Sequence, residues 1–259
     1  MNGAVALVTG ASSGLGAEIA FALSAGGWEL VLVSRNVRRL RAVAEALPAP
    51  AHAVELDLSD AEVGKRLEAA LRRVEIEPSR IALLVNNAGV GSLGPFARTD
   101  VGHLRTMQRV NVAAPMELSR WIAPYMTRAG RGVICNVASV AAFSPGPLMA
   151  EYYADKAWLR SFGLSLDAEL RPYGVAVVTV CPGPFESDFH GRAGIDATRL
   201  GTLPGPRRVA RRTLRAIRRR RPVVAIGLAA RVWALVGPRL PWRVSRAVMH
   251  TLQRRRLEG

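Results

Sequence analysis

Runs of apolar residues alternate with stretches of helical spacing from the fifth residue onward. Most of these runs contain Val, Ile, Leu and Ala without polar alternation, which is typical of parallel strands covered on both faces. Strand and helix patterns that alternate in this way predict a doubly wound α/β fold. The predicted strands are Val5–Thr9, Glu29–Ser34, Ala51–Leu56, Ile81–Asn86, Gly132–Ala138, Val175–Cys181 and Pro222–Ile226, and the helical segments between them include Gly14–Ala25, Arg38–Leu47, Ala61–Val74, Val101–Arg128 and Tyr153–Leu170.

We expect a single parallel sheet of about seven strands with helices on both faces, because no internal repeat and no Ser/Gly-rich linker interrupts the pattern. The catalytic domain is placed at residues 1–226. It includes a glycine-rich loop at 185–205 that is typical of a mobile lid over a ligand crevice. Residues 227–259 are expected to form a basic amphipathic helical extension packed on or beside this domain.

The positive charge is concentrated at the C-terminal end. The net charge is +16, and it comes from residues 199–259, which hold 17 Arg and one acidic residue, whereas residues 1–198 hold 19 basic and 19 acidic residues. Apolar stripes with Trp and flanking Arg between 207 and 256 suit a helix that lies in an anionic membrane interface. Packing against the sheet edge and a dimer surface remain alternatives, and nucleic acid is the least favoured partner.

Composition excludes several classes of protein. Apolar residues make up 49% of the chain, too many for a disordered protein. We predict no spanning helix and no secretory signal, because the N-terminus runs straight into a strand without a basic segment. Cys135 and Cys181 are interpreted as small buried side chains of a reducing compartment, and with four scattered His they form no metal site. We expect a cytoplasmic protein, peripheral at the inner membrane face if its tail binds lipid.

A glycine-rich turn, Thr9-Gly-Ala-Ser-Ser-Gly-Leu-Gly16, follows the first strand and opens a helix. Glycines let the backbone approach a pyrophosphate, and the helix N-terminus presents free N–H groups. The spacing GxxxGxG differs from GxGxxG, so a plain turn is the alternative. After the second strand there is no acidic residue to bind the ribose 2′-hydroxyl of NAD. Arg35 stands there instead and can neutralise the 2′-phosphate of NADP. Asp57 and Leu58 can reach the adenine, and Asp60 is interpreted as a helix N-cap.

Tyr152 and Lys156 carry the clearest chemistry. Lys156 is one of two lysines among 36 basic residues, so it indicates a site where a compact cation is needed. A tyrosine four residues earlier lies one helical turn away, and an ammonium beside a phenol lowers its pKa from about 10. Such a phenol becomes a proton donor and acceptor near neutral pH. The alternatives are that Lys156 is merely an exposed side chain, or that Tyr153, three residues before Lys156, is the tyrosine that shares its helix face.

These motifs occur in the order and spacing of the short-chain dehydrogenase/reductase family, which the chain resembles from residue 4 to about residue 190. That family comprises Rossmann-fold oxidoreductases with a Ser-Tyr-Lys site. Within it the chain is most similar to a bacterial branch that resembles ketoacyl and hydroxysteroid reductases. The matching residues are Thr9–Gly16, Asp57-Leu58, Asn86-Asn-Ala-Gly89, Asn111, Ser139, Tyr152-x-x-x-Lys156 and Cys181-Pro182-Gly183.

The resemblance implies roles for four catalytic residues. Tyr152 exchanges a proton with the substrate oxygen, Lys156 lowers the pKa of the phenol and holds the nicotinamide ribose, and Ser139 orients the substrate oxygen. Asn111 holds a water that links Lys156 to solvent. Ser139 as a helix cap and Asn111 as a core amide are the alternatives. The cofactor, NADP(H) in preference to NAD(H), is expected to contact Thr9, Gly10, Ser12, Ser13, Gly14, Leu15, Gly16, Ser34, Arg35, Asp57, Leu58, Asn87, Ala88, Gly89, Tyr152, Lys156, Pro182, Gly183, Phe185 and Ser187.

The chain departs from the family pattern at three positions without losing a group that the mechanism needs. Ser187 stands where a Thr usually contacts the carboxamide, Ala142 replaces a frequent Gly, and Asp155 replaces the usual Ser or Thr before Lys156.

We therefore expect an NADPH-dependent oxidoreductase that reduces a ketone or aldehyde, or oxidises the alcohol, on a largely apolar substrate. A homo-oligomer, dimer or tetramer, is expected. A membrane-associated lipid or 3-oxoacyl reductase with the tail as anchor is one alternative, and a catalytically silent NADP-binding sensor or scaffold is another. The residues expected to form the apolar pocket are Phe189, Phe143, Leu148, Met149 and Leu93.

Overall fold

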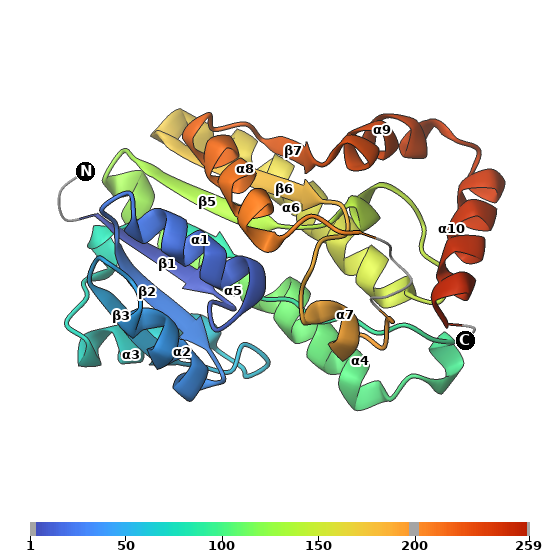
Figure 1. Cartoon of the computed structure of the whole chain (residues 1–259). Coiled ribbons are helices and arrows are strands. Elements are labelled where there is room, and N and C mark those ends of the chain that lie inside the picture. Colours follow the sequence, from blue (N-terminus) through green and yellow to red (C-terminus); the bar gives the residue numbers. More distant parts are fainter. Residues whose placement is uncertain (1–3, 197–201, 258–259) are drawn as a thin grey trace.

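The structure, a computed structural model, describes residues 4–196 and 202–257 (Figure 1). Its described strands form one seven-stranded sheet in the order β3-β2-β1-β4-β5-β6-β7, and every neighbouring pair is parallel. The predicted fold class is therefore confirmed. The strands are β1 Val5–Thr9, β2 Glu29–Ser34, β3 Ala51–Glu55, β4 Ile81–Asn86, β5 Gly132–Val137, β6 Val175–Pro182 and β7 Val223–Ile226.

Helices cover both faces of the sheet, which explains the uninterrupted apolar runs of the strands. Ala6 and Val8 of β1 join a core with α1, α2 and α8 on one face. Val5 and Leu7 of the same strand join a second core with α3, α5 and part of α6 on the other face. The helices are α1 Gly14–Ser24, α2 Val37–Glu45, α3 Val63–Arg73, α4 Val101–Gln108, α5 Ala114–Arg128, α6 Ala150–Leu170, α7 Phe189–Arg192, α8 Pro206–Arg218, α9 Leu228–Val236 and α10 Trp242–Leu257.

The predicted helix 101–128 is helical over its whole length, but it is α-helical only in two parts. It is divided by a π-helical turn at Arg109–Ala113, and Asn111 lies in this turn. A π turn inserts an extra residue into a helix and re-aims its side chains, and such turns are frequent at functional sites. Amphipathic periodicity does not reveal one extra residue, which is why the sequence predicted a single helix.

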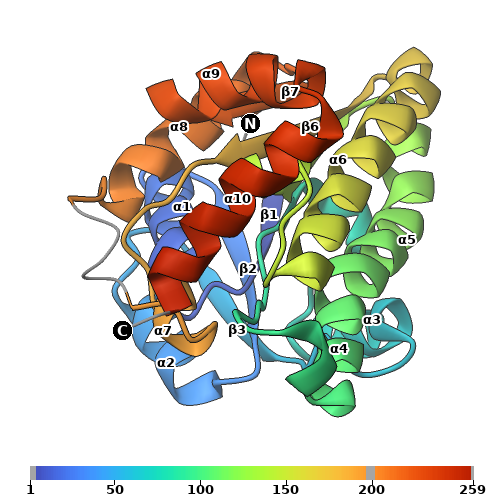
Figure 2. The ribbon, with the colours of Figure 1, turned by 90° about the vertical axis from the view of Figure 1, so that its right-hand side faces the viewer.

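The N-cap predicted at Asp60 was wrong. α3 begins at Val63 after Glu62, whose backbone is left-handed (φ 55°), and Asp60 instead pairs with Arg66. The other predicted boundaries shift by a few residues, most at α6, which begins at Ala150 rather than Tyr153. The predicted domain division at residue 226 stays a prediction. Figure 2 shows α10 crossing in front of the sheet, on the side toward which β6 and β7 point in Figure 1.

A polar row inside the sheet supports α6. Asn86, Asn136 and Thr179 are in register on β4, β5 and β6, and Asn86 Nδ2 donates to Asn136 Oδ1 at 2.9 Å. Gly163 of α6 lies directly over this row, because a Cβ placed on it would meet Thr179 Oγ1 at 2.2 Å. The missing side chain lets the helix that carries Tyr152 and Lys156 approach the sheet closely.

Gly163→Ala should therefore destabilise the fold by about 1–3 kcal/mol, the usual cost of overpacking a core. The expected result is a lower urea midpoint with an unchanged slope. Gly191→Ala is the matched control, since a Cβ there would meet nothing within 4 Å. Equal midpoints for Gly163→Ala and the parent chain would contradict this account of how α6 is seated.

Candidate active site

A cavity of about 1090 Å³ extends from the glycine-rich turn after β1 to the inner side of α10. It lies at the carboxyl ends of the strands, where ligands bind in doubly wound sheets. Of the residues predicted to contact the cofactor, all but Thr9 and Gly16 line it. The predicted catalytic residues Ser139, Tyr152 and Lys156 line it as well, whereas Asn111 does not.

The turn after β1 presents backbone to the cavity. Gly10 and Gly14 have left-handed backbones, with φ of +65° and +56°. A Cβ on Gly16 would lie 2.3 Å from the carbonyl oxygen of Gly10, so this position holds helix and turn together. Ser13, the N-cap of α1, makes no side-chain cap hydrogen bond. The N–H groups of the first helical turn therefore remain suited to an anion such as a pyrophosphate.

Thr9 acts from behind the cavity wall. Its hydroxyl oxygen accepts hydrogen bonds from the backbone N–H groups of Asn87 (3.0 Å) and Ala88 (3.1 Å). The Asn87 side-chain amide donates to the Thr9 carbonyl at 2.9 Å in return. These bonds tie the loop after β1 to the loop after β4, and they orient the backbone of Ala88 and Gly89 toward the cavity.

A cation stands at the cavity rim beside β2. The Arg35 side chain is 60% exposed, and its Nη1 lies 3.8 Å from Asp57 Oδ2. Asp57 also accepts hydrogen bonds from the backbone and hydroxyl of Ser59, at 2.8 and 2.7 Å. An ion pair that is long and solvated holds a guanidinium weakly, so Arg35 is free to turn toward a phosphate. Ser34 Oγ donates to Ser12 Oγ at 2.9 Å and brings the two turns together.

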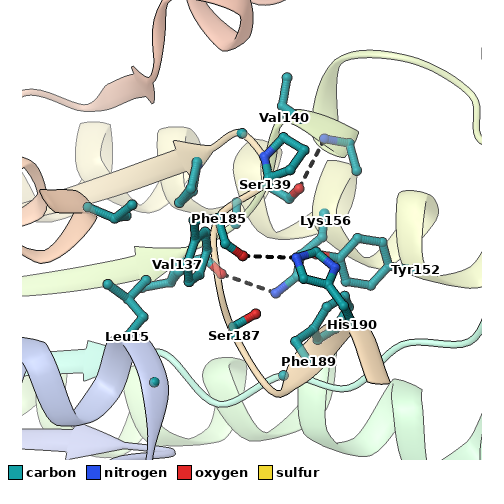
Figure 3. Close-up of a pocket in the computed structure, with 18 of the residues that line it drawn as sticks. Leu15, Val137, Ser139, Val140, Tyr152, Lys156, Phe185, Ser187, Phe189 and His190 are labelled. Carbon is teal, nitrogen blue, oxygen red and sulfur yellow. Dashed lines mark hydrogen bonds between the residues drawn. The ribbon is translucent and has the colours of Figure 1, made fainter. Parts of the chain in front are cut away.

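Ser139, Tyr152 and Lys156 meet deeper in the cavity (Figure 3). Ser139 follows β5, and its Oγ accepts from the backbone N–H of Ala141 at 3.2 Å, so it is also a helix cap. The phenol of Tyr152 is close enough to Ser139 for that side chain to favour the phenolate. Lys156 Nζ donates to the carbonyl oxygen of Val137 at 3.1 Å and lies 5.7 Å from the centroid of the Tyr152 ring.

Tyr153 turns away from this group. Its hydroxyl accepts a hydrogen bond from Gln253 Nε2 of α10 at 2.8 Å, and its ring packs so closely on Gly146 that a Cβ there would lie 2.1 Å from Tyr153 Cγ. Of the two tyrosine registers that the sequence offers, Tyr152 is the one placed beside Ser139 and Lys156.

Burial controls the protonation of this group. Burial raises the pKa of Tyr152 to about 12, and the Ser139 side chain opposes this rise. Burial also lowers the pKa of Lys156 to about 8, while the charge of Asp155 opposes that fall. The sequence predicted that Lys156 brings the pKa of the phenol down. In the structure the phenol's pKa is raised instead, because the cost of burying a phenolate exceeds the attraction of an ammonium directed at Val137.

Asn111 and Asp155 form a buried polar pair beside Lys156. Asn111 Nδ2 donates to Asp155 Oδ2 at 2.7 Å and to the Val90 carbonyl at 2.9 Å, while Asn111 Oδ1 accepts from the Val90 N–H. A Cβ on Gly89 would lie 3.4 Å from both Asn111 Oδ1 and Lys156 Nζ, so these atoms converge there. Asn111 is thus a satisfied core amide, and its distance from the cavity leaves the water-holding role untested.

An apolar roof closes the substrate side. The rings of Tyr152 and Phe189 lie 5.1 Å apart, and Met149, Leu93 and Met249 belong to the same cluster. Phe189 and Met149 line the cavity as predicted, but Phe143, Leu148 and Leu93 do not. Phe143 packs beneath Arg160 in a neighbouring cluster, and Leu148 borders a small adjacent pocket. Apolar residues in a loop have no regular periodicity, so the sequence does not show which of their side chains point into the cavity.

Sequence reasoning missed several cavity residues. His190 is buried, and its Nε2 is hydrogen bonded to the Phe185 carbonyl at 2.9 Å. Trp233 of α9 and Met249 and Gln253 of α10 complete the roof. The signal for α10 was present in the i, i+4, i+8 spacing of its buried residues Ser245, Met249 and Gln253. Part of the predicted lid, residues 197–201, lies outside the described residues.

Over residues 4–196 and 202–257 the structure contains no group of three or more potential metal ligands. Within the same ranges no helix is both long and apolar enough to cross a bilayer.

The geometry can be set beside known proteins. The family model described as short chain dehydrogenase matches residues 4–197. The Very-long-chain 3-oxoacyl-CoA reductase of Ajellomyces capsulatus is 34% identical over 183 residues, which cover 69% of this chain and 54% of that protein. The match therefore spans about half the length of that relative.

Two solved structures are similar over most of the chain. A short-chain dehydrogenase from Sphingobium yanoikuyae in complex with NADPH is 33% identical, with a TM-score of 0.81 over 91% of this chain and 93% of that chain. A short-chain dehydrogenase from Streptomyces avermitilis is 27% identical, with a TM-score of 0.80 over 98% of both chains.

The family match covers most of the chain, and the solved structures share its sheet and helices. The resemblance predicted from the ordered motifs is confirmed. The chain belongs to the short-chain dehydrogenase family of NAD(P)-dependent oxidoreductases.

Proposed function

We propose that the protein is an NADPH-dependent reductase of a ketone or aldehyde on a largely apolar substrate. The observation that carries this proposal is the meeting of Ser139, Tyr152 and Lys156 in one cavity, between a backbone turn suited to a pyrophosphate and an apolar roof. The similarity to a reductase of 3-oxoacyl-CoA chains and to an NADPH complex supports the carbonyl group and the cofactor.

Separate parts of the cavity would hold the separate parts of a dinucleotide. The turn from Gly10 to Leu15 would hold the pyrophosphate, Arg35 the 2′-phosphate, and Lys156 with Asn87 the nicotinamide ribose. The cofactor would supply a hydride to the carbonyl carbon. The protein's own part is then to place the carbonyl oxygen and to deliver one proton to it, which converts the carbonyl into an alcohol.

Tyr152 is the proton donor in this proposal. A phenol with a pKa of about 12 keeps its proton throughout the physiological range, so it is ready to protonate an oxygen that becomes an alkoxide. Ser139 is the second donor to that oxygen, since its hydroxyl lines the cavity beside Tyr152. A protonated phenol favours reduction over oxidation, because oxidation requires the phenolate at the outset.

Lys156 and Asp155 set the charge behind the phenol. With a pKa of about 8, Lys156 is charged at neutral pH but close to losing its proton. A charged Lys156 makes loss of the Tyr152 proton easier. The negative charge of Asp155 raises the pKa of Lys156, and the family's usual Ser or Thr has no charge to do so. Asp155 is therefore proposed to extend the working range of Lys156 toward higher pH.

The expected homo-oligomer stays a prediction, as does the cytoplasmic location.

Replacing Tyr152 tests the reaction. Tyr152→Phe should lower kcat/KM for NADPH oxidation with a panel of apolar ketones and aldehydes by about 10²–10⁴-fold, the contribution of a general acid. Its affinity for NADPH, measured by fluorescence, should not change. Tyr153→Phe is the matched control and should keep activity within about tenfold, since it loses only the hydrogen bonds of its hydroxyl with Gln253 and Met249. Loss of activity in Tyr153→Phe alone would reverse the assignment.

A parent chain that binds NADPH but oxidises it with no carbonyl in the panel would contradict the reductase proposal. It would instead support a silent cofactor-binding protein.

Replacing Arg35 tests the choice of cofactor. Arg35→Ala should weaken NADPH binding by about 10–100-fold, because a charged hydrogen bond to the 2′-phosphate is lost, and it should leave NADH binding nearly unchanged. Arg38→Ala is the control, since Arg38 lies on exposed α2 outside the cavity lining. Equal weakening of both cofactors in Arg35→Ala would show that Arg35 does not read the 2′-phosphate.

Replacing Asp155 tests the pH dependence. Lys156 is charged below its pKa of about 8, so activity should fall as pH rises through that value. Asp155→Asn keeps an acceptor for Asn111 but removes the charge, which lowers the pKa of Lys156 and moves this fall to lower pH.

The same variant, Asp155→Asn, also tests the effect of the buried carboxylate on folding stability. Burial raises the pKa of Asp155 to about 6, so the parent loses stability relative to Asp155→Asn as pH rises from 4 to 6, by roughly 2 kcal/mol.

Glu151→Gln is the control, because Glu151 also raises the pKa of Asp155 but less than burial does. It should keep most of the stability change between pH 4 and 6. Superimposable pH–rate profiles for the parent and Asp155→Asn would mean that Asp155 does not act through Lys156.

A further inference from the structure

The outer side of α9 is apolar and exposed. Leu228, Val232, Leu235 and Val236 follow one another at i, i+4, i+7 and i+8, which places them on one stripe of the helix. They are between 43% and 79% exposed to solvent. Ala230, on the opposite side, is buried against the domain. A nine-residue helix thus shows four large apolar side chains to the outside, more than isolated surface residues would account for.

The apolar surface continues into the start of α10 after the turn at Gly237–Arg239. Trp242 is 61% exposed, and the guanidinium carbons of Arg243 and Arg246 lie 5.4 and 5.0 Å from its ring. Val244 is exposed beside them. An indole flanked by cations is typical of the boundary between lipid headgroups and acyl chains.

Positive charge surrounds this surface, because the segment that carries it contains no acidic residue. Residues 202–257 contain 16 Arg and neither Asp nor Glu. Arg231, Arg239, Arg243 and Arg246 are exposed on or next to the two helices. We define the α9–α10 surface as Leu228, Arg231, Val232, Leu235, Val236, Arg239, Trp242, Arg243, Val244 and Arg246.

The combination of charge and apolar side chains distinguishes three candidate partners of this surface: a second copy of the chain, nucleic acid and an anionic bilayer. A second copy that docked through the same face would set arginines against arginines, because a two-fold contact pairs a surface with itself. Nucleic acid would match the arginines but not the apolar stripe. An anionic bilayer matches both, since its headgroups attract the arginines and its acyl boundary takes up the apolar side chains.

We propose that the α9–α10 surface docks the protein on an anionic lipid membrane. The helices lie on the bilayer rather than across it, with Leu228, Val232 and Leu235 inserted at the acyl boundary.

Leu228 stands at the edge of the cavity as well as on this surface, and the other sides of the two helices face the cavity. Trp233 of α9 and Val248, Met249 and Leu252 of α10 line its roof. Figures 1 and 2 show the two helices joined at an angle around that end of the molecule. Docking would therefore place the cavity's apolar end beside the bilayer, where an apolar carbonyl substrate partitions. This last point rests on the proposed reductase function, whereas docking itself does not.

Sedimentation with vesicles tests the docking without any cofactor or substrate. The full chain should sediment with vesicles of phosphatidylcholine mixed with phosphatidylglycerol, and weakly with phosphatidylcholine alone. Added salt should weaken the binding, because the headgroup attraction is screened. Leu228→Ser/Val232→Ser/Leu235→Ser should weaken the binding at least about tenfold, because burying even one fewer apolar side chain in the bilayer costs about that much affinity.

Two further variants separate the contributions. Arg231→Gln/Arg239→Gln/Arg243→Gln should remove the preference for anionic vesicles while keeping residual binding. Val101→Ser/Leu164→Ser/Tyr173→Ser is the matched control, since these exposed apolar residues lie on other elements, and it should bind like the parent. Urea unfolding of each variant verifies that the fold is intact.

The proposal fails if the parent does not sediment with mixed vesicles, or if the α9 triple variant with an intact fold binds as tightly as the parent. It also fails if the parent forms a dimer in solution that the α9 variant alone abolishes, because the surface would then belong to a second copy. Because NADPH oxidation is measured separately, an inactive protein that binds vesicles would refute the reductase proposal and leave the docking intact.

Discussion

The site depends on the close approach of α6 to the centre of the sheet. Gly163 leaves no room for a side chain above Thr179, and Lys156 reaches the carbonyl of Val137 at the end of β5. With the helix seated at both points, Tyr152 is brought to Ser139, which leaves the same strand two residues after Val137. Tyr152 and Lys156 are thereby positioned by contacts between α6 and the rigid sheet, as precise catalysis requires.

Local patterns in the sequence were enough for the fold and for most of the cofactor side. The turn after β1 and the Asn87–Gly89 segment are encoded by glycine conformation and by side chains that follow strands directly, so neighbouring letters predict them. The choice between Tyr152 and Tyr153 was not local. It depends on Gln253, about a hundred residues later, which binds the hydroxyl of Tyr153 away from Ser139 and Lys156. Pattern reasoning had no access to that contact.

The sign of the pKa shift at Tyr152 was missed for a related reason. Helical spacing gives the distance between a phenol and an ammonium, but burial sets the cost of a phenolate, and burial is a property of the folded chain. The π turn at Asn111 also escaped detection, because one inserted residue does not disturb an amphipathic pattern. In α9 and α10 the sequence showed apolar and basic positions, whereas the division into a cavity side and an outer side required the structure.

The lysine among so many arginines now has a physical explanation. Lys156 is 4% exposed, and in the part of the chain that the structure describes no carboxylate lies within ion-pair distance of its ammonium, since Asp155 is held by Asn111 instead. An arginine in such a place would stay charged at any accessible pH and would need several acceptors for its five N–H groups. A lysine needs fewer acceptors, and its pKa of about 8 shows that it can yield its proton. The position therefore suits a compact cation that needs few acceptors, and a guanidinium is not one.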